Sequence, residues 1–161
     1  MSELLIIYHS RTGGSRQMAE AAHGAARGEC ACTLLTAEAA TPDDILRADG
    51  YIFCAPENLA ALSGAMKEFF DRCYYEVLGR IEGRPYALMI CAGSDGAGAV
   101  RQAARIAQGW RLRPVQEPLI VCTHAQTQEQ ILGPKTIAED DLARCRETGQ
   151  ALAAGLEMGV F

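Results

Sequence analysis

Short, nearly continuous apolar runs alternate with segments of helical periodicity along the whole chain. The candidate strands are "LLIIY" (4–8), "CTLL" (32–35), "YIFCA" (51–55), "YALMICA" (86–92) and "PLIVC" (118–122). Continuous apolar runs, unlike runs that alternate with polar residues, are typical of strands covered on both faces. They therefore predict a buried, parallel sheet.

The segments between these runs place apolar side chains on one side of a helix. Helices are predicted over 15–27, 64–78, 97–109 and 138–157, with a shorter helix before the third strand. Regular alternation of strands and helices indicates an α/β sandwich with helices on both faces of the sheet. Right-handed crossovers leave few topologies, and five strands of this size fit the order 2-1-3-4-5. The polar segment 123–140 has no firm period and is expected to form a long loop, a feature that is often functional.

Composition narrows the class of protein. The 161 residues suggest one domain, 1–161, and 49% of them are hydrophobic, enough for a sizeable core. A net charge of −5 argues against nucleic-acid binding, and no apolar stretch approaches the roughly 20 residues that span a bilayer. We expect a cytoplasmic protein that does not bind membranes. Of the seven cysteines, Cys54, Cys91 and Cys122 lie in apolar runs and are expected to be buried.

The stretch "YHSRTGGSRQ" (8–17) joins the first strand to the first helix. Gly13 and Gly14 permit unusual dihedral angles, and Ser15 is a candidate N-cap. Amides and the helix dipole at such a position attract an anion, so the loop is predicted to hold a phosphate. It matches neither the Walker nor the dinucleotide fingerprint. The alternative is an ordinary glycine-containing turn. Further donors and charge could come from Ser10, Arg11, Thr12 and Arg16.

Three motifs at the ends of predicted strands carry a resemblance to a known family. "SRTGGS" (10–15) resembles the phosphate loop of flavodoxins. "CAPENLAALSGAMKEFFDRCYY" (54–75) and "CAGSDGAGAVRQAARIAQGWRLRP" (91–114) are similar to the segments after the third and fourth strands of flavodoxin-like NAD(P)H-dependent oxidoreductases. The resemblance covers essentially the whole chain. It implies a flavodoxin-like fold, FMN as cofactor, and NADH or NADPH as co-substrate.

The resemblance also implies a set of cofactor-binding residues. The FMN phosphate would be held by Ser10, Arg11, Thr12, Gly13, Gly14 and Ser15. The isoalloxazine ring would be bordered by Pro56, Glu57, Asn58 and Leu59 and by Gly93, Ser94, Asp95 and Gly96. No catalytic side chain is identified, since the redox chemistry belongs to the cofactor. No metal site is expected.

One departure from electron-carrying flavodoxins bears on function. Segments 55–63 and 92–97 contain no aromatic residue to cover the ring. An open ring face suits hydride delivery from NAD(P)H and then reduction of a small acceptor such as a quinone or free flavin. It also suits coverage by a second subunit in a homodimer or homotetramer. The alternatives are a flavodoxin-type carrier that does not oxidise NAD(P)H, and a flavin-free binding protein on the same fold.

Several polar and aromatic residues near these motifs have two interpretations. Glu57 and Asp95 lie near the proposed site, and each is either a charge of that site or simply a solvated loop charge or a helix-start carboxylate. Asp95 would precede the helix that begins near Ala97, where a carboxylate is favourable. His9 either approaches the ligand or is a loop polar group. Trp110 is expected to serve packing or an interface.

Overall fold

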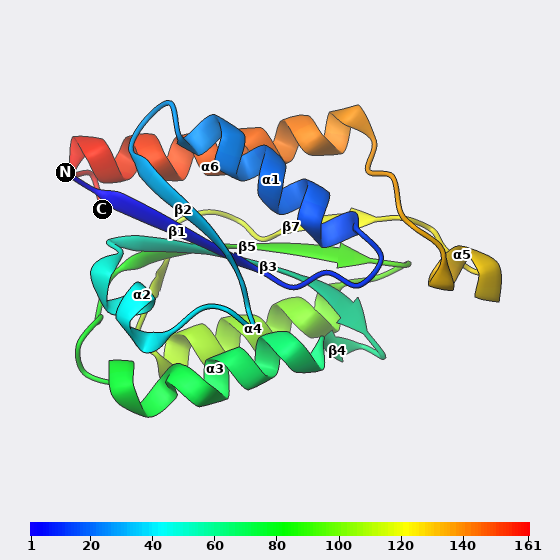
Figure 1. The fold of residues 1–161 in the computed structure, drawn as a ribbon, viewed down its shortest axis with the longest axis horizontal. Helices are drawn as coiled ribbons and strands as arrows, with labels where there is room; N and C mark the ends of the chain where they lie inside the picture. Colours follow the sequence, from blue (N-terminus) through cyan, green and yellow to red (C-terminus); the bar gives the residue numbers. More distant parts are fainter.

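The protein is built on a parallel sheet whose strands are the five apolar runs (Figure 1). The computed structural model describes residues 1–161. The main strands are β1 (Glu3–Tyr8), β2 (Ala31–Thr36), β3 (Gly50–Asn58), β5 (Pro85–Ala92) and β7 (Leu119–Cys122). They pair in the order β2-β1-β3-β5-β7, all parallel, which is the predicted order 2-1-3-4-5.

Two short strands modify this plan. β4 (Ala61–Leu62) folds back antiparallel on the end of β3 and forms a hairpin with it. β6 (Arg113–Pro114) pairs with the start of β5, and β7 pairs with its end. The strand next to β5 at this edge of the sheet is therefore divided into β6 and β7. β7 begins at Leu119, one residue later than the apolar run 118–122 predicts.

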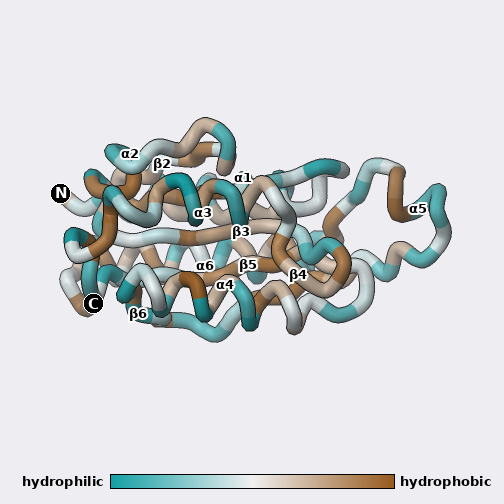
Figure 2. Tube along the Cα trace, turned by 90° about the horizontal axis from the view of Figure 1, so that it is seen from below, coloured by the Kyte–Doolittle hydropathy of each residue, from teal (hydrophilic) through white to brown (hydrophobic).

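Helices cover both faces of the sheet (Figure 1). On one face lie α1 (Gly14–Ala26) and α6 (Glu139–Met158), which share a buried cluster with Leu4, Ile6 and Met89. On the other face lie α2 (Pro42–Arg47), α3 (Gly64–Val77) and α4 (Ala97–Gly109). Figure 2, which views the sheet through the layer of α3 and α4, shows hydrophobic stretches along β3 and β5. None of the helices is long and apolar enough to cross a bilayer.

The two layers pack by different means. Between α1 and α6 the backbones approach so closely that a Cβ on Gly149 would lie 2.2 Å from the Ala22 carbonyl oxygen. The opposite layer is filled by aromatic rings, and Trp110 meets Phe70 edge-on with the ring centroids 5.2 Å apart. Trp110 is 2% exposed, which confirms its role in packing.

Three local expectations are wrong. Segment 123–140 is not all loop, because α5 (Gln128–Leu132) forms within it and projects beyond the sheet (Figures 1 and 2). Ser15 is not the N-cap of α1, since Gly13 occupies that position with a φ of 98° and the helix starts at Gly14. Cys122 is only half-buried, whereas Cys54 and Cys91 are buried as expected.

Candidate functional site

The loops that follow β1, β3, β5 and β7 meet at the carboxyl end of the sheet, where open α/β proteins bind ligands (Figure 1). Between them lies a cavity of about 510 Å³. The predicted binding residues along its walls are Arg11, Thr12, Pro56, Glu57, Asn58, Leu59 and Gly93. The structure thus brings residues of all three predicted loops together around one space, whereas Ser10 and Gly13 line a different cavity.

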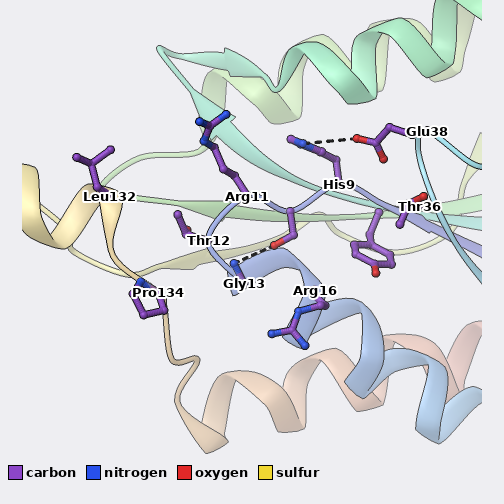
Figure 3. A pocket seen from close by; sticks show the side chains of 11 residues that line it. His9, Arg11, Thr12, Gly13, Arg16, Thr36, Glu38, Leu132 and Pro134 are labelled. Atoms are coloured by element: carbon purple, nitrogen blue, oxygen red, sulfur yellow. Dashed lines mark hydrogen bonds and ion pairs between the residues drawn. The ribbon is translucent and has the colours of Figure 1, made fainter.

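A second cavity of about 520 Å³ also borders the loop between β1 and α1 and shares Arg11 and Thr12 with the first (Figure 3). His9 belongs to this second cavity. Its Nδ1 lies 2.9 Å from Ser63 Oγ, and its Nε2 lies 3.8 Å from Glu38. His9 therefore lies away from the walls of the first cavity and has partners within the protein.

The loop between β1 and α1 is an array of unpaired backbone donors. Gly13 N–H donates to Ser10 Oγ over 3.1 Å, and Gln17 N–H donates to the Gly13 carbonyl. Backbone N–H groups without an acceptor in the protein belong to Ser10, Arg11, Thr12, Gly14, Ser15 and Arg16. Adjacent amides of this kind at a helix start form an anion-binding concavity.

The Ser15 hydroxyl gives a second, independent indication of a ligand. Ser15 is 2% exposed, and its Oγ is the one buried side-chain oxygen or nitrogen that lacks a hydrogen-bond partner. An unpaired buried hydroxyl destabilises a fold by about 1–3 kcal/mol. Such a group persists where a ligand completes its hydrogen bonding, and it lies here within the row of unpaired amides.

The turn between β3 and β4 is strained at the mouth of the first cavity. Leu59 and Ala60 have φ angles of 53° and 65°, a left-handed conformation that costs a non-glycine residue about 1–2 kcal/mol. The Leu59 side chain is fully exposed (100%). A strained turn that holds an apolar side chain in solvent beside a cavity is a typical feature of a ligand site.

Polar contacts from α4 hold this turn in place. The Glu57 carboxylate accepts from Gly96 N–H at 2.9 Å and from Ala99 N–H at 3.1 Å. Leu62 N–H donates to Gln102 Oε1 over 2.7 Å. Of the two interpretations of Glu57, the geometry therefore shows a carboxylate that stabilises a helix start, although its side chain also borders the cavity.

The predicted loop 93–96 contributes less to the cavity than expected. Only Gly93 lies in its wall, whereas Ser94, Asp95 and Gly96 do not. Gly96 is the N-cap of α4 with a φ of 94°, and Asp95 Oδ1 accepts from Ala97 N–H. These residues start the helix.

Sequence reasoning missed the wall that the segment after β7 provides. Thr123, Ala125, Ile131 and Lys135 all line the first cavity. The unusual length of the polar segment 123–140 indicated a functional loop, but it did not identify which of its residues would line a cavity. Cys91 and Ala92 complete the wall, and burial raises the pKa of the Cys91 thiol to about 11, so the thiol is neutral near pH 7.

The fold of this protein is flavodoxin-like. It superposes on a flavodoxin from the domain Archaea with a TM-score of 0.78, 14% identity, and coverage of 96% of this chain and 99% of the other. It superposes on the flavodoxin, WrbA-like protein from Agrobacterium tumefaciens with a TM-score of 0.77 and 17% identity. The superposition covers 98% of this chain and 99% of the other. The model of the family described as NADPH-dependent FMN reductase matches residues 25–127, and the chain belongs to this FMN-binding oxidoreductase family.

Two curated proteins are similar in sequence. A flavodoxin from Aquifex aeolicus is 36% identical over 100 residues, which are 61% of this chain and 54% of that protein. An NAD(P)H dehydrogenase (quinone) from Acidithiobacillus ferrooxidans is 34% identical over 94 residues, which are 45% and 47% of the two chains. The chain spans about half the length of these relatives.

Proposed function

We propose that this protein binds FMN at the carboxyl end of its sheet and transfers electrons from NADH or NADPH to a small acceptor such as a quinone or free flavin. The observation that carries the proposal is the buried, unpaired Ser15 hydroxyl among unpaired loop amides, beside a cavity of about 510 Å³. An orphaned hydroxyl and a row of amides suit a phosphate group, and the adjoining cavity leaves space for a ring system.

The phosphate would be held mainly by the backbone between β1 and α1. Gly13 adopts the left-handed conformation that starts α1, and Gly14 fits closely against Cys91, where a Cβ would lie 2.6 Å from Sγ. Ser10 Oγ already accepts from Gly13 N–H, so its own proton is available to the phosphate. The Ser15 hydroxyl gains the partner that it lacks within the protein.

The ring would lie between the β3–β4 hairpin and the loop after β5. Pro56 to Leu59 would border one side of it, and Gly93 the other. When bound, FMN accepts hydride and passes electrons on. The residues of this chain would bind and orient the cofactor, and the exposed apolar side chains of Leu59 and Ile131 would be available to contact it at the edge of the cavity.

The absence of an aromatic cover favours a reductase. Segments 55–63 and 92–97 contain no aromatic side chain, so the ring would remain accessible to a nicotinamide and then to the acceptor. The family match and the quinone dehydrogenase relative support the same interpretation. A homodimer or homotetramer, which size-exclusion chromatography would reveal, would cover part of this face.

A flavodoxin-type electron carrier is the second candidate, because the Aquifex aeolicus relative is a flavodoxin. The two functions separate in one experiment. FMN-loaded, desalted protein is mixed with NADH or NADPH, with and without a quinone, and oxidation of the nicotinamide is followed. Turnover supports the reductase, and a stable semiquinone without direct nicotinamide oxidation would support the carrier. A protein that takes up no FMN would point to a flavin-free binding protein.

A further inference from the structure

The chain has only two lysines, and their surroundings differ. Lys67 Nζ forms an ion pair with Asp71 Oδ1 over 2.6 Å. Lys135 has no carboxylate within ion-pair distance. Its Nζ donates instead to three neutral oxygens, namely Thr12 Oγ1 (3.3 Å), the Ile131 carbonyl (2.9 Å) and the Gly133 carbonyl (2.6 Å). The ammonium of Lys135 therefore has neutral oxygens as partners and no carboxylate.

Lys135 belongs to a segment, residues 133–137, that is fixed against the phosphate loop and that we call the strap. Lys135 N–H donates to the Thr12 carbonyl over 2.8 Å. Gln17 joins the strap to α1, since its Nε2 donates to the Lys135 carbonyl (2.7 Å) and its Oε1 accepts from Ile137 N–H (3.0 Å). Ile137 is 4% exposed. The position of Lys135 is thus set by backbone contacts and packing.

Lys135 lies at the end of the first cavity that is formed by the loop between β1 and α1. Lys135 lines that cavity together with Arg11 and Thr12. A Cβ placed on Gly14 would lie 3.7 Å from Lys135 Cβ, so the strap lies directly beside the first turn of α1. Arg11 is exposed, and Arg16 lies 3.5 Å from Glu20. Lys135 is therefore a cation that the fold holds beside the loop without a carboxylate partner.

We infer that Lys135 exchanges its long bond to Thr12 Oγ1 (3.3 Å) for a phosphate oxygen of a bound flavin, supplies the counter-charge there, and so makes the site prefer FMN over riboflavin. A phosphate group carries about −1.5 to −2 charges at pH 7, whereas the loop amides are neutral donors and the chain has a net charge of −5. The inference rests on the proposed function, because it needs a flavin at this site. If Lys135 only held the strap in place, its loss would weaken FMN and riboflavin alike.

The test compares the wild-type apoprotein with Lys135→Met, Lys135→Arg and, as matched control, Lys67→Met. Each is titrated with FMN and with riboflavin, and quenching of flavin fluorescence gives the Kd. Lys135→Met should raise the Kd for FMN about tenfold to a hundredfold, the range of a charge-assisted hydrogen bond, and leave that for riboflavin unchanged. Lys135→Arg should retain most of the preference for FMN, and Lys67→Met all of it.

Two outcomes would overturn the inference alone: an unchanged Kd for FMN in Lys135→Met, or an equal loss of affinity for both flavins. A wild-type protein that binds neither flavin would overturn the proposed function as well. Amine-reactive labelling gives a second readout with the unmodified chain. FMN should protect Lys135 and leave Lys67 reactive, whereas equal labelling of Lys135 with and without saturating FMN would contradict a direct contact.

Discussion

Replacement of Gly98 by alanine should displace the β3–β4 hairpin that borders the proposed ring site. Gly98 lies in the first turn of α4, where a Cβ would be 2.0 Å from the Ala60 carbonyl oxygen and 3.4 Å from Glu57 Oε2. An ordinary contact begins near 3.4 Å, so the Ala60 carbonyl must retreat by about 1.4 Å. Backbone, unlike a flexible side-chain end, does not yield easily to such a contact.

The expected magnitude follows from what this retreat disturbs. Overpacking costs about 1–3 kcal/mol, and loss of the bond from Leu62 N–H to Gln102 adds about 1 kcal/mol. The higher helix propensity of alanine offsets part of this loss, because alanine inside a helix is about 1 kcal/mol more favourable than glycine. The free energy of unfolding should therefore fall by about 1–3 kcal/mol, which lowers Tm by roughly 2–12 °C in a chain of this size. FMN affinity should fall as well, because the hairpin moves.

Gly24→Ala is the matched control. Gly24 also lies inside a helix, but nothing lies within 4 Å of the point that a Cβ would occupy there, so alanine should stabilise the protein by about 0.5–1 kcal/mol. Both variants are unfolded by urea and by heat under far-UV circular dichroism, and both are titrated with FMN. Equal stability of Gly98→Ala and Gly24→Ala would show that the contact with Ala60 carries no cost, and the predicted displacement of the hairpin would then be wrong.

Three further predictions concern the phosphate loop and the buried thiols. Ser15→Ala removes the unpaired buried hydroxyl, so it should raise the apoprotein's free energy of unfolding by about 1 kcal/mol and reduce the stabilisation that added FMN gives. Urea unfolding with and without FMN measures both quantities. A variant apoprotein less stable than the wild type would show that the hydroxyl has a partner within the protein. Gly13→Val places a branched residue at a φ of 98°, which should lower the free energy of unfolding by about 1–2 kcal/mol or more. The variant should also lose FMN on a desalting column. Full retention of FMN would argue against this loop as the phosphate site. Burial raises the pKa of Cys91 to about 11 and of Cys32 and Cys145 to about 12, from 9.0. Above about pH 9 the unfolded thiols lose protons that the folded ones keep, so stability should fall by up to about 1.4 kcal/mol per pH unit for each thiol; urea midpoints that do not fall between about pH 8 and about pH 10 would contradict this.

The sheet could be predicted because each strand is marked by local apolarity. Burial on both faces removes the need for alternation, and the run "YALMICA" is buried at every position in β5. The short elements were missed because they depend on distant partners or on few residues. β6 has two exposed residues and exists only by pairing with β5. For α5 a local signal was present, since Thr127 and Gln130 form a capping box.

The phosphate loop could be predicted because its glycines and hydroxyls are adjacent in sequence. The contacts that shape the rest of the site join distant positions. Glu57 reaches Gly96 across 39 positions, and Lys135 reaches Thr12 across 123. The N-cap of α1 was misplaced because serine is the commoner cap residue, whereas here the left-handed conformation of Gly13 starts the helix.

The proposed function depends above all on whether the unpaired amides and the Ser15 hydroxyl hold the phosphate of FMN. Titration of the desalted apoprotein with FMN, followed by absorption and fluorescence, decides this. We expect saturation at one FMN per chain, with flavin bands that survive a second desalting step in the wild type and disappear in Gly13→Val. A wild-type protein that leaves the FMN spectrum unchanged and emerges colourless from the column would show that the loop does not hold this cofactor.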